Sequence, residues 1–308
     1  MLKKKAKNWL IYIIKVVVPN HFINKIKRKR QRNKLAQFKA SLRNNILTYH
    51  EANNDEEIKE VVTYLQKNPV SVFPYNFAKK YKKEVIEVYF DQSNGLRYVM
   101  HQNKRLYFKK NMTDKAIKSL YYGLLLDQDK NSPHLYITDN FNLDRHDVVA
   151  DVGAAEGNFS LSIIESVRKI YLFEPDEEWI EPLKATFEPW KDKVVIINKF
   201  VTNFESESTI SMNSFYKKNP DITFFKVDIE GEEQNFLNSC ESILKKHINL
   251  KIAICTYHKQ DDEKAFMTQL KSYGFTAQTS RGYMIYMYDK NLDVPYLRRG
   301  LIRAQKTC

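Results

Sequence analysis

A glycine-containing turn directly after an apolar strand is the feature of this 308-residue chain that most restricts its fold. Residues 148–150 are apolar, and residues 151–160 read Asp-Val-Gly-Ala-Ala-Glu-Gly-Asn-Phe-Ser. Gly153 and Gly157 carry no Cβ, so the backbone can turn tightly there and approach a ligand closely. The pattern predicts a strand, a tight turn and then a helix that begins beside a bound ligand.

The acidic residue at the start of this turn indicates the kind of ligand. The carboxylate of Asp151 can accept a hydrogen bond from an ammonium group, whereas it would repel a pyrophosphate. The turn also lacks the third glycine of the dinucleotide pattern Gly-x-Gly-x-x-Gly. Both features favour S-adenosylmethionine over a nicotinamide cofactor, although Asp151 could instead serve only as a hydrogen-bond acceptor within the turn. The expected cofactor contacts in this segment are Asp151, Gly153, Ala154, Glu156, Gly157, Asn158 and Phe159.

A second acidic residue follows the next predicted strand. Residues 169–173 are largely apolar and lead into Glu174-Pro175-Asp176. Because ligands of open α/β sheets bind at the carboxyl ends of the strands, we expect Glu174 to bind the ribose hydroxyls and Pro175 to lie beside the cofactor. The alternative is that Glu174 only forms a turn and caps the helix that begins near Asp176.

A third acidic cluster follows the predicted strand 222–227. Asp228 and Glu230 are two residues apart, so they project to the same side if the strand continues through them. Two carboxylates on one side suit a site that moves protons or holds a cation, and Asp228 is also expected to contact the cofactor. For Glu232 and Glu233 we expect only a favourable interaction with the positive end of a helix dipole.

These three segments together resemble the FkbM family of S-adenosylmethionine-dependent O-methyltransferases. The resemblance is carried by residues 151–160, 173–175 and 226–232 and covers roughly residues 140–290. It implies a doubly wound methyltransferase sheet and methyl transfer to a hydroxyl, often on the sugar of a glycan or natural product. The family commonly has a Leu-Asp pair upstream of the third segment, where this chain reads Ser211-Met212-Asn213.

Methyl transfer to a hydroxyl needs a group that removes one proton. His258 follows the predicted strand 250–256, at the edge where such folds place site residues, and is the expected base; the alternative is a structural histidine. We expect Asp228, Glu230 and His258 to act in metal-free acid–base chemistry. The alternative is that the three converge on a divalent cation that lowers the pKa of the acceptor hydroxyl.

The remaining histidine and cysteine candidates carry weaker signals. His134 lies in a predicted loop before the first strand of the sheet and is expected either to close over the cofactor or to be a turn residue. Cys240, Cys255 and Cys308 lack the spacing of a disulfide framework or a zinc site, which indicates a reducing compartment. Cys255 is expected to be a small core residue.

The amino-terminal arm carries the excess positive charge of the chain. Residues 1–50 hold 14 Lys and Arg and no Asp or Glu, whereas the remaining 258 residues hold 36 basic and 37 acidic residues. An apolar run at 9–18, with Trp9 and Tyr12, lies between two basic clusters and is too short for a bilayer, which needs about 20 residues. We expect residues 1–32 to lie on an anionic membrane surface.

Two alternatives to a membrane role remain open for the arm. The apolar run could pack on its own domain, or the basic residues could bind nucleic acid. The segment 25–32 has no interleaved aromatic residues on which bases could stack, so a nucleic-acid partner is not favoured. The expected location is the cytoplasm, with peripheral association at the inner face of the membrane.

The order of predicted elements gives an α/β protein with three parts. Residues 1–50 form the arm, residues 51–140 a small α+β extension, and residues 141–308 a Rossmann-like, doubly wound methyltransferase domain. The extension is expected to contain a helix at 55–67, a hairpin of 85–91 with 96–101, a strand near Leu106 and a helix from Thr113. Strands of the last part are expected near 147–152, 169–174, 193–198, 222–228, 250–256, 275–279 and 282–288.

The sequence therefore predicts an enzyme: an S-adenosylmethionine-dependent O-methyltransferase acting on a sugar or glycan hydroxyl, lipid-linked or on a cell-surface polysaccharide. A second hypothesis is a basic-armed membrane- or RNA-binding protein whose methyltransferase-like domain is inactive. A nicotinamide-dependent oxidoreductase is a third, which Asp151 and the absence of a third glycine disfavour.

Overall fold

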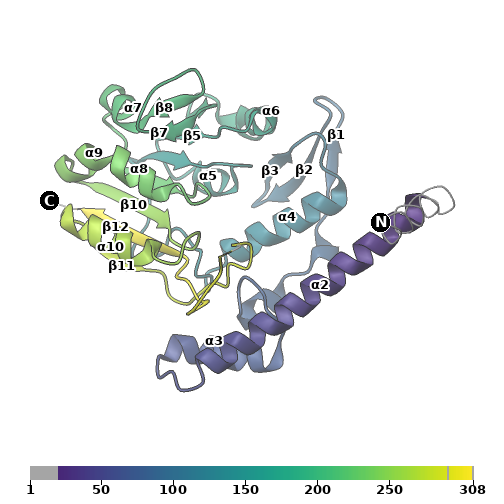
Figure 1. Cartoon of the computed structure of the whole chain (residues 1–308). Coiled ribbons are helices and arrows are strands. Elements are labelled where there is room, and N and C mark those ends of the chain that lie inside the picture. The colour runs from purple at the N-terminus through teal and green to yellow at the C-terminus, as the bar shows by residue number, and fades with distance from the viewer. Residues whose placement is uncertain (1–19, 290, 307–308) are drawn as a thin grey trace, which may run out of the picture.

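The computed structural model of the protein describes residues 20–289 and 291–306. Its centre is a seven-stranded sheet in the order β11-β12-β10-β9-β4-β5-β6 (Figure 1). All neighbouring strands from β6 to β10 are parallel, and β12 is antiparallel to both of its neighbours. The strands are β4 (Val148–Val152), β5 (Lys169–Phe173), β6 (Val194–Ile197), β9 (Phe224–Val227), β10 (Leu250–Cys255), β11 (Thr276–Thr279) and β12 (Leu301–Lys306).

Both faces of this sheet are covered, as the predicted doubly wound fold requires. Along β4 the side chains alternate, so Val149 belongs to one apolar core, and Val148 and Ala150 to another. The first core includes side chains of α4 (Asp114–Asp127), α5 (Asn158–Ile163) and α6 (Glu177–Phe187). The second includes those of α7 (Met212–Lys218), α8 (Glu233–Ser239), α9 (Glu241–Lys246) and α10 (Asp262–Ser272). The α/β, doubly wound prediction is confirmed.

The strand order resembles that of dinucleotide-binding sheets. With the parallel strands numbered along the chain, β6 to β10 follow the order 3-2-1-4-5. The reversal of strand order lies between β4 and β9, and it is there that such sheets open a crevice for a ligand. The antiparallel β12 is inserted between β10 and β11.

One predicted strand is wrong. Residues 282–288 form turns and a single bridge between Met284 and Arg298, and the antiparallel partner of β10 and β11 is β12 instead. Met284 and Ile285 are buried outside the sheet, in a core that they share with Val61 and Leu65 of the extension, whereas Tyr288 is 72% exposed. A two-stranded parallel sheet of β7 (Phe200–Thr202) and β8 (Thr209–Ser211) was not anticipated.

The extension contains the predicted elements. The helix α3 (Glu56–Lys67) begins at Asp55, whose side chain accepts the amide hydrogens of Glu57 and Ile58. The strands β1 (Tyr89–Asp91), β2 (Leu96–His101) and β3 (Lys104–Phe108) form an antiparallel sheet. The first strand is shorter than the predicted 85–91, because Val85 belongs to the 3-10 turn η2 (Lys83–Val85) and β1 begins only at Tyr89. Further 3-10 turns are η1 (Asn76–Lys80) and η3 (Glu188–Trp190).

The end of the arm forms a long helix, α2 (Asn20–Tyr49), which extends along one side of the molecule past α3 (Figure 1). Leu42 and Ile46 bury their side chains in the core shared with α3, whereas residues 29–38 are all exposed. The predicted apolar run with Trp9 and Tyr12 lies outside the described residues. Among the described helices, none combines the length and apolar character needed to cross a membrane.

Candidate functional site

A cavity of about 910 Å³ opens at the carboxyl ends of β4, β5 and β9. Five residues singled out in the sequence line it: Gly153, Glu174, Pro175, Asp228 and Glu230. The wall also includes Ala155, Trp179 and the β7–β8 segment with Phe200 and Phe204. Acidic residues that follow β5 and β9 thus face one space together with Gly153, which follows β4. The volume of the cavity suits a ligand of cofactor size.

At Gly153, directly after β4, the backbone passes close to that of Asp228, directly after β9. The φ of Gly153, +80°, is a conformation that favours glycine. A Cβ at this position would collide with the backbone carbonyl of Asp228. Gly157 also has a positive φ, +83°, but a Cβ there would lie 2.9 Å from Leu183 and Phe187, so this glycine serves the packing of α5 on α6.

The other predicted contacts of the turn lie behind the cavity wall. Ala154, Glu156, Asn158 and Phe159 are buried at the start of α5 and do not belong to the lining. Burial raises the pKa of Glu156 to about 7, against the opposing influence of Lys226. These residues therefore shape the turn, while Gly153 and Ala155 face the ligand space.

Glu174 joins two turns at the edge of the sheet and faces the cavity. One carboxylate oxygen accepts the Asp176 amide hydrogen at 2.9 Å, and the other accepts the Ala155 amide hydrogen at 2.8 Å. Burial raises the pKa of Glu174, and the two amide hydrogen bonds oppose that shift. The carboxylate thus ties the β5 turn to the β4 turn and still lines the cavity, and the cap of α6 is Asp176 rather than Glu174.

Asp151 does not reach the cavity. It is fully buried, and its carboxylate lies 2.9 Å from the ammonium nitrogen of Lys226 and accepts the Ser160 hydroxyl hydrogen at 2.7 Å. Lys226 also donates to the Gly153 carbonyl at 2.5 Å. Burial alone would lower the pKa of Lys226, but Asp151 and Asp228 outweigh it and raise that pKa to about 12. Asp151 thus acts through an internal ion pair, not through the predicted contact with a ligand ammonium.

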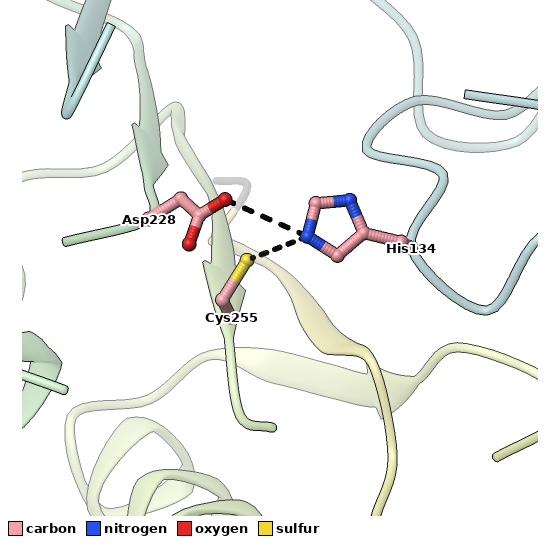
Figure 2. Close-up of side chains that lie close together, drawn as sticks. All are labelled: His134, Asp228 and Cys255. Atoms are coloured by element: carbon pink, nitrogen blue, oxygen red, sulfur yellow. Dashed lines mark hydrogen bonds and ion pairs between the residues drawn. The ribbon is translucent and has the colours of Figure 1, made fainter. Parts of the chain in front are cut away.

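Asp228 lies where the cavity meets a set of buried aromatic and imidazole groups. Its carboxylate accepts hydroxyl hydrogens from Tyr136 at 2.8 Å and from Tyr257 at 3.1 Å. His134 Nε2 lies 3.5 Å from the same carboxylate (Figure 2). Burial would raise the pKa of Asp228, but His134, Lys226 and His258 together hold it well below its usual range. The carboxylate is therefore ionised.

His258 is positioned by a buried carboxylate. Its Nδ1 lies 3.0 Å from Glu233, which is fully buried. Its Nε2 lies 3.7 Å from Asp228 and 3.6 Å from Glu230. Burial lowers the pKa of His258, but Glu233, Asp228 and Glu230 overcome this and raise it above the ordinary value. The predicted trio of Asp228, Glu230 and His258 is thus brought together.

The strand was expected to continue through Asp228 and Glu230 and so to direct both side chains to the same side, but it does not. β9 ends at Val227, so no pleat aligns the two side chains. The chain turns instead, with φ of +55° at Glu230 and +93° at Gly231. The Glu230 side chain remains 84% exposed, whereas that of Asp228 is 19% exposed. Glu230 therefore stands at the open rim and Asp228 at the wall.

Several residues of the site were missed or assigned a lesser role. Glu233 does begin α8, as expected, but it also holds His258. Lys226 could have been found, because a lysine inside a buried strand requires a charged partner. Arg298 donates to the backbone carbonyls of Tyr257 and His258, and no local pattern marks it. In the segment where the FkbM pattern has an Asp, Ser211 caps α7.

Comparisons with known proteins returned solved structures alone. Neither a family model nor a curated protein matches the chain. A methyltransferase FkbM from Methylobacillus flagellatus is 16% identical with a TM-score of 0.43, covering 63% of this chain and 55% of its own. An rRNA methylase from Streptococcus thermophilus is 17% identical with a TM-score of 0.36, covering 54% of this chain and 90% of its own. The precorrin-6y C5,15-methyltransferase of Geobacter metallireducens is 12% identical with a TM-score of 0.38, covering 54% and 83%. The match with the first spans little more than half of that methyltransferase.

The close approach at Gly153 predicts a large effect of one methyl group. Gly153→Ala should lower the free energy of unfolding by more than about 3 kcal/mol, because it adds a backbone collision to the cost of a positive φ. Gly95→Ala is the control: its φ is +72°, and a Cβ there meets nothing within 4 Å. Urea unfolding of both variants measures the difference. Equal losses would show that the backbones at Gly153 and Asp228 do not approach each other as described.

Proposed function

We propose that this protein is an S-adenosylmethionine-dependent O-methyltransferase. The observation that carries the proposal is that Gly153, Glu174 and Asp228, which follow three different strands, line one cavity at the switch point of a doubly wound sheet. The resemblance of these segments to the FkbM family supports the same chemistry.

The cavity suits this cofactor in several respects. Gly153 lets the backbone after β4 pass close to that of Asp228 at the cavity wall, the Glu174 carboxylate can accept ribose hydroxyl hydrogens, and Trp179 offers an apolar surface for a base. The ionised Asp228 provides a negative charge for a positively charged ligand. S-adenosylmethionine supplies a methyl group whose bond to sulfur breaks as the bond to the acceptor oxygen forms.

His258 is proposed as the base that takes the proton of the acceptor hydroxyl. Glu233 fixes the ring through Nδ1, so Nε2 faces Asp228 and Glu230, both of which line the cavity. The same carboxylates stabilise the imidazolium that forms when the proton arrives. The principal task of the protein is to hold the acceptor in line with the methyl group.

The acceptor is proposed to be a sugar hydroxyl, on a lipid-linked or cell-surface glycan. The FkbM resemblance supports this choice, and the exposed rings of Phe200 and Phe204 at the cavity offer faces on which a sugar can pack. Incubation with labelled cofactor and cell-envelope glycan fractions, followed by identification of the methylated position, tests it. Label recovered only in protein, RNA or small molecules would exclude a glycan acceptor.

A membrane role is proposed for the arm. The exposed part of α2 carries Lys29, Arg30, Arg32 and Lys34 beside Leu35, so it combines positive charge with apolar surface. This continues the basic and apolar composition of the preceding residues and would bring the enzyme to anionic lipids at the inner face of the membrane.

Substitutions at two carboxylates should separate catalysis from cofactor binding. Asp228→Ala should abolish methyl transfer, whereas Glu174→Ala should weaken binding of S-adenosylhomocysteine about tenfold to a hundredfold, the equivalent of about 1.5–3 kcal/mol of charged hydrogen bonds. Turnover assays and calorimetry measure both, with the exposed Asp221→Asn as control. Wild-type protein that bound NAD instead of S-adenosylhomocysteine would be an oxidoreductase, contrary to this proposal.

Replacing the proposed base should affect turnover and leave cofactor binding intact. His258→Gln should lower kcat by about 10²–10⁴-fold, the usual contribution of a general base. The affinity for S-adenosylhomocysteine should stay within about twofold, because His258 is not part of the cavity lining. His146→Gln changes an exposed histidine and serves as control. If kcat of the His258 variant stays near that of wild type, another group takes the proton.

Removing the arm should separate membrane binding from cofactor binding. A variant lacking residues 1–30 should no longer sediment with anionic vesicles but should bind S-adenosylhomocysteine as wild type does, since Leu42 and Ile46, which anchor α2, remain. Neutral vesicles are the control for wild-type protein. Unchanged sedimentation of the truncated protein would show that the arm is not the membrane-binding part.

A further inference from the structure

We propose that the protein binds one zinc ion through His134, Asp228 and Cys255. The three residues come from distant parts of the chain: a loop before β4, the turn after β9 and the last residue of β10. Figure 2 shows the carboxylate of Asp228 and the thiol of Cys255 both directed at Nε2 of His134. One potential ligand atom of each residue therefore lies beside the same small space.

The distances between these atoms match those of ligands around one small cation. Nε2 of His134 lies 3.5 Å from the Asp228 carboxylate and 3.5 Å from Sγ of Cys255, and all three atoms lie within 4.8 Å of one another. Zinc bonds of about 2.0–2.3 Å in tetrahedral geometry separate neighbouring ligand atoms by about 3.3–3.6 Å. Small adjustments of the side chains would let the three contact the same ion.

The chemistry of the three groups favours zinc over magnesium or calcium. Thiolate and imidazole are ligands of zinc and related ions, whereas magnesium and calcium take oxygen ligands. A coordinated thiol loses its proton, so Asp228 and Cys255 would contribute two negative charges that balance the ion. His134 and Cys255 are almost completely buried, at 4% and 0% exposure, which keeps competing water away from them.

A neighbouring group of possible ligands is a weaker choice. Asp228, Glu233 and His258 also have ligand atoms within 4.8 Å of one another. The near oxygen of Glu233, however, accepts the Ile229 amide hydrogen at 2.9 Å and lies 3.0 Å from His258. The charge of Glu233 is therefore already balanced by His258. The thiol of Cys255 is not needed to balance a charged neighbour in this way and offers its sulfur to an ion.

The loop that carries His134 is held in place from several sides. Arg303 of β12 donates to the backbone carbonyls of Leu135 and Tyr136, and Gln128 donates to that of His134 at 3.1 Å. Gly300 of the segment before β12 lets the backbone pass close to Pro133, where a Cβ would collide. The imidazole therefore faces β9 and β10 before any ion binds, which is the preorganisation that a specific metal site needs.

A zinc ion here would join the loop to the ends of β9 and β10 and fix the carboxylate of Asp228. Because Asp228 also lines the cavity, the ion would lie beside the bound acceptor. Only this consequence rests on the proposed methyl transfer. Binding of the ion itself requires no activity. It should stabilise the fold, since a ligand that binds only the folded chain raises its stability.

Metal content and thermal unfolding of the full-length, tag-free protein test the proposal. After exposure to zinc and removal of the excess, about one zinc per chain should remain, and a strong chelator should remove it and lower Tm. Cobalt substitution should give the near-ultraviolet absorption of a thiolate–cobalt bond. Wild-type protein that retains no zinc, or whose cobalt spectrum lacks that absorption, overturns the proposal whether or not any variant folds.

Matched variants identify the ligands. Cys255→Ser and His134→Gln should each weaken zinc affinity at least about tenfold, the lower range for disturbing a metal site, and the serine variant should lose the thiolate absorption. Cys240→Ser, which removes a buried thiol of the other core, and Glu233→Gln should retain both. Thiolate absorption that persists in Cys255→Ser refutes this site. Protein that retains zinc but does not bind S-adenosylhomocysteine would contradict the methyltransferase proposal alone. Protein that binds S-adenosylhomocysteine but retains no zinc would contradict the zinc site alone.

Discussion

The buried ion pair between Lys226 and Asp151 is the interaction on which the arrangement of the site depends. Lys226 stands in β9 and Asp151 in the neighbouring β4, so the pair links the two strands between which the sheet order reverses. By donating to the Gly153 carbonyl as well, Lys226 fixes the turn at the cavity wall. Removing one partner of such a pair leaves an uncompensated buried charge, at a cost of about 3–5 kcal/mol.

The ammonium group of Lys226 also affects the carboxylate of Asp228, which lines the cavity. Lys226 contributes to holding Asp228 ionised, and two tyrosine hydroxyls and two imidazoles lie around that carboxylate. Burying so many polar groups is costly unless each has a partner. Among the described residues, the buried side-chain atoms without a hydrogen-bond partner belong to His134, Asp151, Glu233 and His258. Two of these atoms, Oδ1 of Asp151 and Nδ1 of His258, lie within ion-pair distance of Lys226 and Glu233. His134, Glu233 and His258 lie close to Asp228, and such polar atoms with incomplete hydrogen bonding are typical of functional sites.

The sequence predicts those parts of the site that depend on local pattern. Apolar runs followed by Gly153, Glu174 and Asp228 locate the strand ends, and parallel strands bring such ends to one edge. Contacts between distant segments carry no local signal: Tyr136 and Asp228 are 92 positions apart, and His134 and Cys255 are 121 apart. Cysteine spacing thus could not indicate the proposed zinc ligands. The prediction of a strand at 282–288 failed for a related reason, because a run of apolar residues indicates burial but not the partner against which it packs.

The segment after β11 connects the extension to the proposed base. Met284 and Ile285 are buried in the core formed with α2 and α3, whereas Arg298 of the same segment donates to the backbone carbonyls of Tyr257 and His258. The bridge between Met284 and Arg298 joins these two anchor points directly. Since a packed core resists displacement, the helices of the extension restrain the backbone that carries His258. The extension is therefore a structural support of the site, and its loss would disturb the proposed chemistry without removing any residue from the cavity wall.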